Sequence, residues 1–338
     1  MFKFLNNNFM ILFSAAAVLI LVNFAKADDG HIRRPLKGQG PTKIYVAMGL
    51  LDIDEIDSAS QSFVANVYLE IRWYDSRLKH SGVGRKVVPM NSIWHPQLLF
   101  VNQQKIWPTF PEVAHISPGG EVTYRQRMWG PFSQPLDVQN FPFDKQHFEI
   151  RVACADETTN ELQLVRDTGT TSGIADKFSL PDWKVLKWEI VFNPYKPTGS
   201  GEDVASFALV LYAARFASHF IWKVILPLIL IVAMSWVVFW IDPSETGAQI
   251  GVGTTSMLTL IAYRFVVEDM VPTVPYLTRI DYFILGSTLL VFAALLQVVI
   301  TSRLAKTGRL KIARKIDVWC RFIFPGILIC ITYLSLVS

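Results

Sequence analysis

The chain has 338 residues, a formal net charge of +4 and a composition that is 51% hydrophobic. So mild a charge does not indicate a nucleic-acid partner, and three scattered cysteines (Cys154, Cys320, Cys330) do not provide a disulfide framework. The hydrophobic residues are concentrated after residue 217. We therefore expect a soluble domain over residues 28–217 and a membrane domain over residues 218–338.

The N-terminus has the pattern of a secretory signal peptide. Lys3 supplies a positive start, residues 10–22 form an apolar core, and Ala25-Lys26-Ala27 is an A-x-A cleavage site. A first transmembrane anchor is the alternative, but the apolar core is short and ends at the cleavage motif. We expect residues 1–27 to be removed, which would leave the soluble domain outside the membrane.

The soluble part is expected to form an antiparallel β-sandwich. Segments such as 62–73 and 146–152 are rich in β-branched and aromatic residues, and several alternate apolar with polar positions. Turn-forming sequences such as Ser117-Pro-Gly-Gly separate them. Many short strands at this spacing favour a sandwich.

Four apolar spans follow, at about 220–241, 249–271, 282–300 and 318–336. A basic cluster in the link 303–315 marks that link as cytoplasmic, because cytoplasmic loops carry an excess of Lys and Arg. The soluble domain, the link 272–279 and the C-terminus would then lie outside. The sequence thus predicts an α+β membrane protein, with an extracellular or periplasmic sandwich followed by a four-helix transmembrane bundle.

The second span carries a stripe whose composition is unusual for a lipid-facing surface. At steps of three and four residues it contains Gly247, Gly251, Thr255, Leu258, Ala262, Phe265 and Asp269. At about 1.5 Å per residue, the segment 247–272 is roughly 37 Å long, enough to cross a bilayer. Two interpretations stay open for this helix alone. It is either buried among other helices, with Gly247 and Gly251 as a close-packing motif, or it lines a pore.

Five motifs follow one another along the chain in an order that can be compared with known families. They are Trp73-Tyr74-Asp75, the segment 93–102, Phe141-Pro-Phe-Asp-Lys-Gln146, Pro227 in the first span, and Pro-Thr-Val-Pro-Tyr-Leu-Thr at 272–278. In this order they resemble the pentameric ligand-gated ion channel (Cys-loop receptor) family in its bacterial form. The resemblance covers nearly the whole chain after residue 40.

The chain departs from the family pattern at four positions. The places of the paired cysteines of animal receptors correspond to Gln134 and Phe148, so no Cys-loop disulfide is expected. The sensing glutamate and the pore-helix histidine of proton-gated bacterial members correspond to Gln61 and Leu260. Proton gating by that route is therefore not supported.

The resemblance implies a homopentamer in which each stripe residue becomes a ring. Rings of Leu258, Ala262 and Phe265 would form an apolar girdle that gates by dewetting, while Gly247, Gly251 and Thr255 would line the wider inner half. Asp269 at the outer mouth would concentrate inorganic cations.

Two further carboxylates lie near the ends of the pore helix. Glu245 sits near the inner mouth, where a selectivity role and a solvated helix start stay open. Glu268 lies one helical turn from Arg264 and is expected to pair with it.

The resemblance also implies a ligand site between subunits, where aromatic residues attract an amine by cation–π interaction. Tyr68 occupies the aromatic position of one face and Tyr195 lies in the segment similar to the capping loop. Another aromatic is missing near residues 154–156, and Trp107 is a candidate to replace it. Packing within the sandwich is the alternative role for these side chains.

Coupling between the domains is assigned by the resemblance to residues where the sandwich meets the membrane. They are Asp57, Asp144, Arg215, Pro275 and Tyr276, with an ion pair expected between Arg215 and Asp144. Solvated turn charges are the alternative interpretation.

Other function classes fit less well. The six histidines show no metal-ligand spacing, and no nucleophile elbow or phosphate loop is present, so we expect no enzyme, no metal and no cofactor. Paired halves with broken helices, typical of a transporter, are not seen. A membrane-anchored sensor without conduction is the main alternative to a channel. We expect a multi-pass protein of the bacterial inner membrane, in contact with lipid, that is opened by an unidentified small molecule or by protons.

Overall fold

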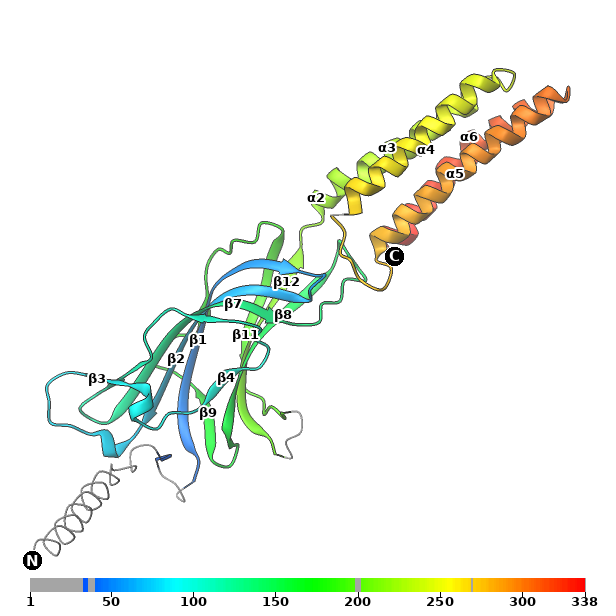
Figure 1. Ribbon diagram of the computed structural model, residues 1–338. Coiled ribbons are helices and arrows are strands. Elements are labelled where there is room, and N and C mark those ends of the chain that lie inside the picture. The colour runs from blue at the N-terminus through cyan, green and yellow to red at the C-terminus, as the bar shows by residue number, and fades with distance from the viewer. Residues whose placement is uncertain (1–32, 36–39, 198–201, 269, 338) are drawn as a thin grey trace, which may run out of the picture.

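The computed structural model describes residues 33–35, 40–197, 202–268 and 270–337. It consists of a β-sandwich followed by a bundle of membrane-length helices that extends from one end of the sandwich (Figure 1). The expected signal peptide, residues 1–27, lies outside the described residues.

The first sheet has the strand order β10-β1-β2-β7-β6-β3, with β5 paired to β7 and β9 paired to β1. Its strands are β1 (Thr42–Asp57), β2 (Ser62–Tyr74), β3 (Lys86–Pro89), β5 (Trp107–Pro108), β6 (Val113–Ile116), β7 (Glu121–Ser133), β9 (Leu162–Arg166) and β10 (Gly173–Ile174). Pairing is antiparallel except where β9 and β10 run parallel to β1.

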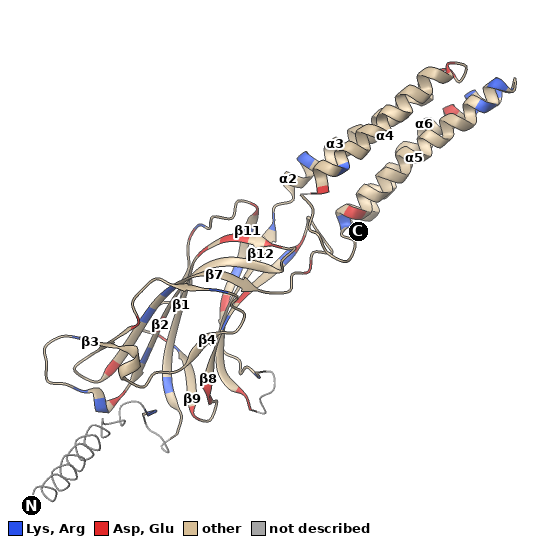
Figure 2. Ribbon diagram, in the orientation of Figure 1, with Lys and Arg blue, Asp and Glu red and all other residues tan. Residues whose placement is uncertain are grey.

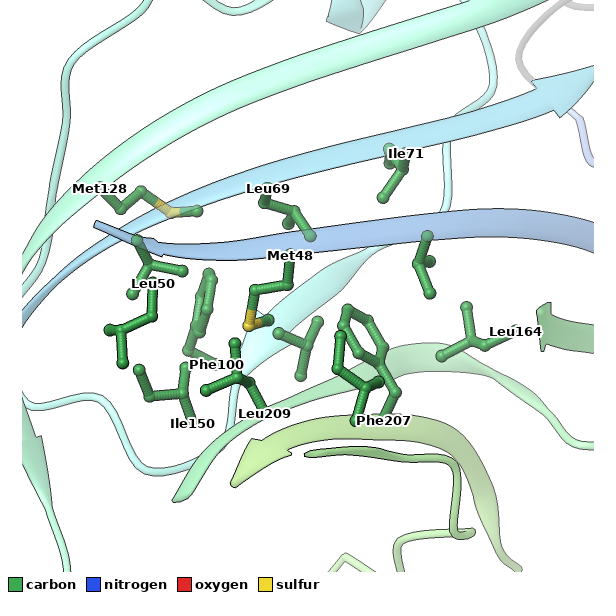
Figure 3. Close-up of a cluster of buried hydrophobic side chains, with 14 of the residues drawn as sticks. Met48, Leu50, Leu69, Ile71, Phe100, Met128, Ile150, Leu164, Phe207 and Leu209 are labelled. Carbon is green, nitrogen blue, oxygen red and sulfur yellow. The ribbon is translucent and has the colours of Figure 1, made fainter. Parts of the chain in front are cut away.

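The second sheet has the order β11-β12-β8-β4 and is antiparallel throughout. Its strands are β4 (Leu98–Phe100), β8 (Lys145–Thr158), β11 (Trp183–Val191) and β12 (Val204–Arg215). Apolar side chains from both sheets meet in one core, which includes Met48 and Leu50 of β1 and Phe207 and Leu209 of β12 (Figure 3). The expected sandwich is thus confirmed.

Four helical segments are long and apolar enough to cross a membrane: Ser218–Trp240, Thr246–Glu268, Arg279–Lys306 and Leu310–Leu336. The first is built from α2 (Ser218–Phe220), a π-helical turn η4 (Ile221–Ile225), α3 (Leu226–Trp236) and a 3₁₀ turn η5 (Val237–Trp240). The others are α4 (Thr246–Glu268), α5 (Arg279–Lys306) and α6 (Leu310–Thr332), which continues into η6 (Tyr333–Val337). The expected four-helix membrane domain is confirmed, and the protein is a multi-pass membrane protein.

The turn η4 is explained by Pro227. A proline has no N–H, so it cannot donate to the carbonyl of Lys223 one helical turn earlier. The Tyr263 hydroxyl of α4 donates instead to the carbonyls of Lys223 at 3.2 Å and Val224 at 2.8 Å. This hydrogen bonding joins the C-terminal half of α4 to the first span.

The third membrane-length helix, α5, is longer than the apolar span 282–300 that was predicted from the sequence. At its start Thr278 and Asp281 form a capping box, in which the Thr278 backbone N–H donates to Asp281 Oδ2 at 2.8 Å. At its end it includes the basic residues Arg303 and Lys306, whose charge is favourable near a helix C-terminus. The link to α6 is therefore only residues 307–309, and the charges gather at the ends of the helices (Figure 2).

Candidate functional site

The stripe predicted to line a pore lies on the exposed side of α4. Leu258 and Phe265 are 67% and 69% exposed in the single chain. The other described members of the stripe are exposed as well: Gly247, Gly251, Thr255 and Ala262. The opposite side of α4 is buried against the rest of the chain, through Gln249, Gly253, Ser256, Leu260 and Val267.

The glycines of α4 show which face packs within the chain. A Cβ atom added to Gly247 or Gly251 would meet no atom within 4 Å, whereas one on Gly253 would lie 3.0 Å from Leu295 Cδ1 of α5. The close-packing interpretation of Gly247 and Gly251 therefore finds no partner within the described chain. Gly253 makes the close helix contact instead.

Thr255 carries the hydroxyl group of the stripe, and this hydroxyl already donates a hydrogen bond within the helix. Thr255 Oγ1 donates to the Gly251 carbonyl at 2.8 Å. Its oxygen keeps acceptor lone pairs on the exposed side. An oxygen presented in this way suits a cation better than an anion.

The two carboxylates just before α4, Asp242 and Glu245, differ in their partners. Asp242 accepts from Ser244 and forms an ion pair with Arg314 at 2.6 Å, and these contacts, the Ser244 bonds first, lower the pKa of Asp242. Glu245 is exposed and forms no ion pair within the described part of the chain. Asp269, expected at the outer mouth, lies outside the described residues.

The expected pairing of Arg264 with Glu268 is not formed, since no ion pair between them lies within 4 Å among the described residues. Both side chains instead line a pocket of about 430 Å³ between the outer ends of α4 and α5. Phe265, Asp281 and Ile284 contribute to the same pocket.

Tyr68 lies on β2 within a polar cluster on the outer side of the first sheet. Its hydroxyl donates to Glu70 Oε2 at 3.0 Å, and Arg125 Nε donates to the same oxygen at 2.7 Å. Thr170 donates to Glu70 Oε1 at 2.8 Å. Burial raises the pKa of Glu70, but the hydrogen bonds from Arg125, Thr170 and Tyr68 outweigh it, and the pKa is lowered.

Tyr195 and Trp107 lie in different parts of the sandwich. Tyr195 precedes β12 of the second sheet, where its backbone exchanges hydrogen bonds with Val204 at 2.9 and 2.8 Å. Trp107 belongs to the first sheet and stacks on Trp129 with ring centroids 5.3 Å apart. Lys105 Nζ lies 5.3 Å from the Trp107 ring. Tyr68 lies on β2 of the first sheet and Tyr195 pairs with the start of β12 of the second, and no contact between their rings is found among the described residues.

Arg215 and Asp144 form a buried ion pair at the end of the sandwich nearest the helices. Arg215 Nε donates to Asp144 Oδ1 at 2.8 Å, and the two side chains are only 10% and 1% exposed. The guanidinium lies over Trp183 at 4.3 Å and Phe141 at 4.9 Å. Aromatic faces attract a desolvated cation, so the arginine is held on several sides.

The loop that contains Phe141 also contacts the helices directly. Phe141 packs on Phe220 with ring centroids 4.6 Å apart, and the backbone N–H of Val138 donates to the Tyr276 hydroxyl at 3.2 Å. An apolar cluster of Val138, Phe141, Phe220, Val224, Val267 and Ile280 joins this loop to three helical segments. We call it the junction cluster. Phe141 in the turn sequence Asn140-Phe-Pro-Phe was the signal for this cluster, whereas Phe143 of the same turn is 37% exposed and lies outside it.

The other two coupling candidates make fewer contacts. Asp57 accepts from the backbone N–H groups of Ala59 at 2.8 Å and Ser60 at 3.2 Å, and hydrogen bonding, chiefly from the Ser60 side chain, lowers its pKa. It thus closes the turn between β1 and β2. Pro275 is exposed, next to Tyr276.

Comparisons with known proteins agree with this architecture. A family model described as the neurotransmitter-gated ion-channel ligand binding domain matches residues 28–203, and one described as the neurotransmitter-gated ion-channel transmembrane region matches residues 224–310. The gamma-aminobutyric acid receptor subunit beta of Lymnaea stagnalis is 26% identical over 284 residues, which are 78% of this chain and 56% of that protein. The chain therefore spans about half the length of the curated relative that it matches.

Proposed function

The chain belongs to the neurotransmitter-gated ion-channel family and is not an enzyme, and on this premise we propose that it forms a ligand-gated, cation-selective channel. The observation that carries the proposal is the exposed stripe of α4. Leu258 and Phe265 share this exposed face with two glycines and Thr255, and such a mixture of small, hydroxylated and apolar residues is unusual for a surface that faces lipid. Copies of the same helix around a common axis give the stripe an interior to face.

We propose a homopentamer, as the family implies. Each copy supplies one pore helix, and rings of Leu258, Ala262 and Phe265 form the gate. A girdle without hydrogen-bonding groups expels water when it narrows, so ions stop before the pore is sterically closed. Gly247, Gly251 and Thr255 form the wider inner half.

Cation selectivity is supported by the acceptor oxygen of Thr255 and by the free carboxylate of Glu245. Asp269 adds a negative ring at the outer mouth in this proposal. Carboxylates at a pore mouth raise the local concentration of cations.

We propose that the ligand binds between subunits. Tyr68 and Tyr195 come from opposite sheets of one sandwich, so they can share a ligand only when two copies meet. The ligand class that suits two tyrosines is a small amine, which aromatic rings attract by cation–π interaction. The coupling route runs through Asp144, Arg215 and the junction cluster to Tyr276, with Asp57 and Pro275 beside it.

We propose that the soluble domain and the C-terminus lie outside the plasma membrane of a bacterium, and that the signal peptide is removed. The short basic link at 307–309 and its flanking helix ends would then face the cytoplasm.

Planar-bilayer recording on the purified protein tests the proposal. A panel of small amines and a pH series should include a condition that elicits current, and ion substitution should show that sodium carries it. Protein that binds an amine without conducting would instead be a membrane-anchored sensor. Mass measurement of the detergent-solubilised complex tests the pentamer, and a stable monomer or tetramer would contradict it.

A further inference from the structure

Two polar side chains are buried between α5 and α6, within the membrane-spanning bundle. Gln297 is 8% exposed and Asp317 is 2% exposed. The Gln297 amide Nε2 donates to Asp317 Oδ1. The other oxygen of each side chain, Gln297 Oε1 and Asp317 Oδ2, is buried and has no hydrogen-bond partner. Two acceptors without a donor are expensive in an apolar interior.

Three cations lie near Asp317 in sequence: Lys315 has an exposed side chain, and the two arginines are engaged elsewhere. Arg321, one helical turn further along α6, donates its Nε to the Phe239 carbonyl at 3.0 Å and lies over the Trp240 ring at 5.3 Å. Arg314 pairs with Asp242 at 2.6 Å. No ion pair of Asp317 is found among the described residues.

The surrounding elements offer no other charge that would hold Asp317 as a carboxylate. The segments α3 and η5 contain no titratable residue, and α5 presents the uncharged Thr301 and Ser302 one turn from Gln297. Cys320 is a titratable neighbour on α6 itself, and Asp242 in the link before α4 is paired with Arg314. A negative carboxylate at Asp317 would therefore be opposed chiefly by burial.

We propose that Asp317 is a buried proton-binding site. A proton taken from water onto Oδ2 would be donated to Gln297 Oε1, while the Gln297 amide continues to donate to Oδ1. The two groups would then form a closed acid–amide ring in which each gives one hydrogen bond and accepts one. A single proton satisfies both unpartnered oxygens and removes the charge from the membrane interior. The ring joins α5 to α6, and loss of the proton opens one of its two bonds.

Infrared spectroscopy of the full-length protein in nanodiscs tests the protonation state directly. A carboxylic acid has a C=O stretching band that a carboxylate lacks. We expect this band near neutral pH in the wild type, and its loss in Asp317→Asn. Identical spectra of the two proteins in this region would overturn the proposal, because Asp317 would then be ionised and its oxygens bridged by water.

Matched variants test the ring itself. In Asp317→Asn, the new amide can donate to Gln297 Oε1 and accept from Nε2, so the ring is kept without a proton. We expect Asp317→Asn to keep the thermal midpoint of the wild type near neutral pH, and Asp317→Leu and Gln297→Leu to lower it. A midpoint for Asp317→Asn as low as that of Asp317→Leu would contradict the ring.

The pH dependence gives a separate readout. If the folded protein binds this proton and the unfolded chain does not, stability must fall as pH rises. The wild-type midpoint should therefore decline relative to that of Asp317→Asn as the solution becomes alkaline. Parallel pH profiles for the two proteins would overturn the proposal even if all variants fold.

Discussion

The Arg215 guanidinium is held between the Asp144 carboxylate, 2.8 Å from its Nε, and the rings of Trp183 and Phe141. Asp144 and Phe141 belong to the loop that contacts the helices, and Arg215 is the last residue of β12, just before the first span. The ion pair thus joins the loop that contacts the helices to the strand that continues into the first span. We expect a displacement of one to be transmitted to the other.

Breaking this pair on one side should be costly. Asp144→Asn would leave a buried arginine without a counter-charge, and loss of one partner of a buried pair costs about 3–5 kcal/mol. We expect a lower thermal midpoint and weaker currents. A double-mutant cycle with Arg215→Ala measures the coupling, and additive effects of the two substitutions would mean that the pair does not act as a unit.

Leu258→Thr should ease opening. A hydroxyl in the apolar girdle lowers the free energy of wetting, so the conducting state gains relative to the closed state. Each 1.4 kcal/mol gained, about the tenfold step of any equilibrium, would raise the opening equilibrium tenfold and move the activation curve to lower ligand concentration. The control is Leu289→Thr on α5, an equally apolar side chain that is 59% exposed but off the stripe. Equal behaviour of the two variants would remove Leu258 from the gate.

Charge at the pore ends should control which ions pass. Glu245→Gln is expected to move the reversal potential in a sodium chloride gradient toward the chloride potential. Asp242→Asn, at a carboxylate already paired with Arg314, should move it less. A wild-type reversal potential near the chloride value would refute cation selectivity.

Asp269→Asn should reduce conductance more at low salt than at high salt. The reason is that salt screens charges beyond about 10 Å at 0.1 M. Single-channel conductance measured over a range of ionic strength checks this. A reduction independent of salt would indicate a steric effect rather than an electrostatic one.

Tyr276→Phe should weaken coupling between ligand binding and opening. The Tyr276 hydroxyl accepts the Val138 N–H at 3.2 Å, and a neutral hydrogen bond contributes about 0.5–1.5 kcal/mol. We expect a roughly 2- to 12-fold loss in the opening equilibrium, the range that this energy implies. Tyr282→Phe, at an exposed tyrosine on α5, is the control. Currents that are the same for both variants would place Tyr276 outside the coupling route.

Arg125→Ala should change stability in a pH-dependent way. Arg125 helps to lower the pKa of Glu70, so the ionised Glu70 contributes stability at neutral pH that is lost as pH falls through its lowered pKa. The difference in thermal midpoint between wild type and Arg125→Ala should therefore shrink on acidification. Arg127→Ala removes a hydrogen bond to the neutral Asn66, and its effect should not vary with pH. A constant difference for Arg125→Ala would show that Glu70 is not its partner in solution.

Much of the fold could be predicted because periodicity and hydropathy report burial directly. The four spans and the sandwich strands follow from apolar runs and alternation. The parallel pairing of β9 and β10 with β1 could not be predicted, since it joins segments more than 100 residues apart, such as Thr42 and Leu162. The start of α5 could have been predicted from the sequence, because Thr278-x-x-Asp281 is a capping pattern.

The candidate site was predictable to a lesser degree. The spacing of Leu258 and Phe265 placed them on one face, and the structure shows that face exposed. Spacing alone could not show which glycine packs against α5, because Gly251 and Gly253 lie on different sides of the same helix. The prediction of an ion pair between Arg264 and Glu268 was wrong. A separation of four residues on a helix permits such a pair but does not require it.

The contact of Gly253 with Leu295 determines how α4 can move. At Gly253 the helix lies so close to α5 that an added Cβ atom would press on the Leu295 side chain, whereas its C-terminal end adjoins the pocket lined by Arg264 and Glu268. The other end of α4 is attached to the first span by the Tyr263 hydroxyl and to the junction cluster by Val267. A movement of the junction cluster would therefore reach Phe265 first, Leu258 next and Gly251 last.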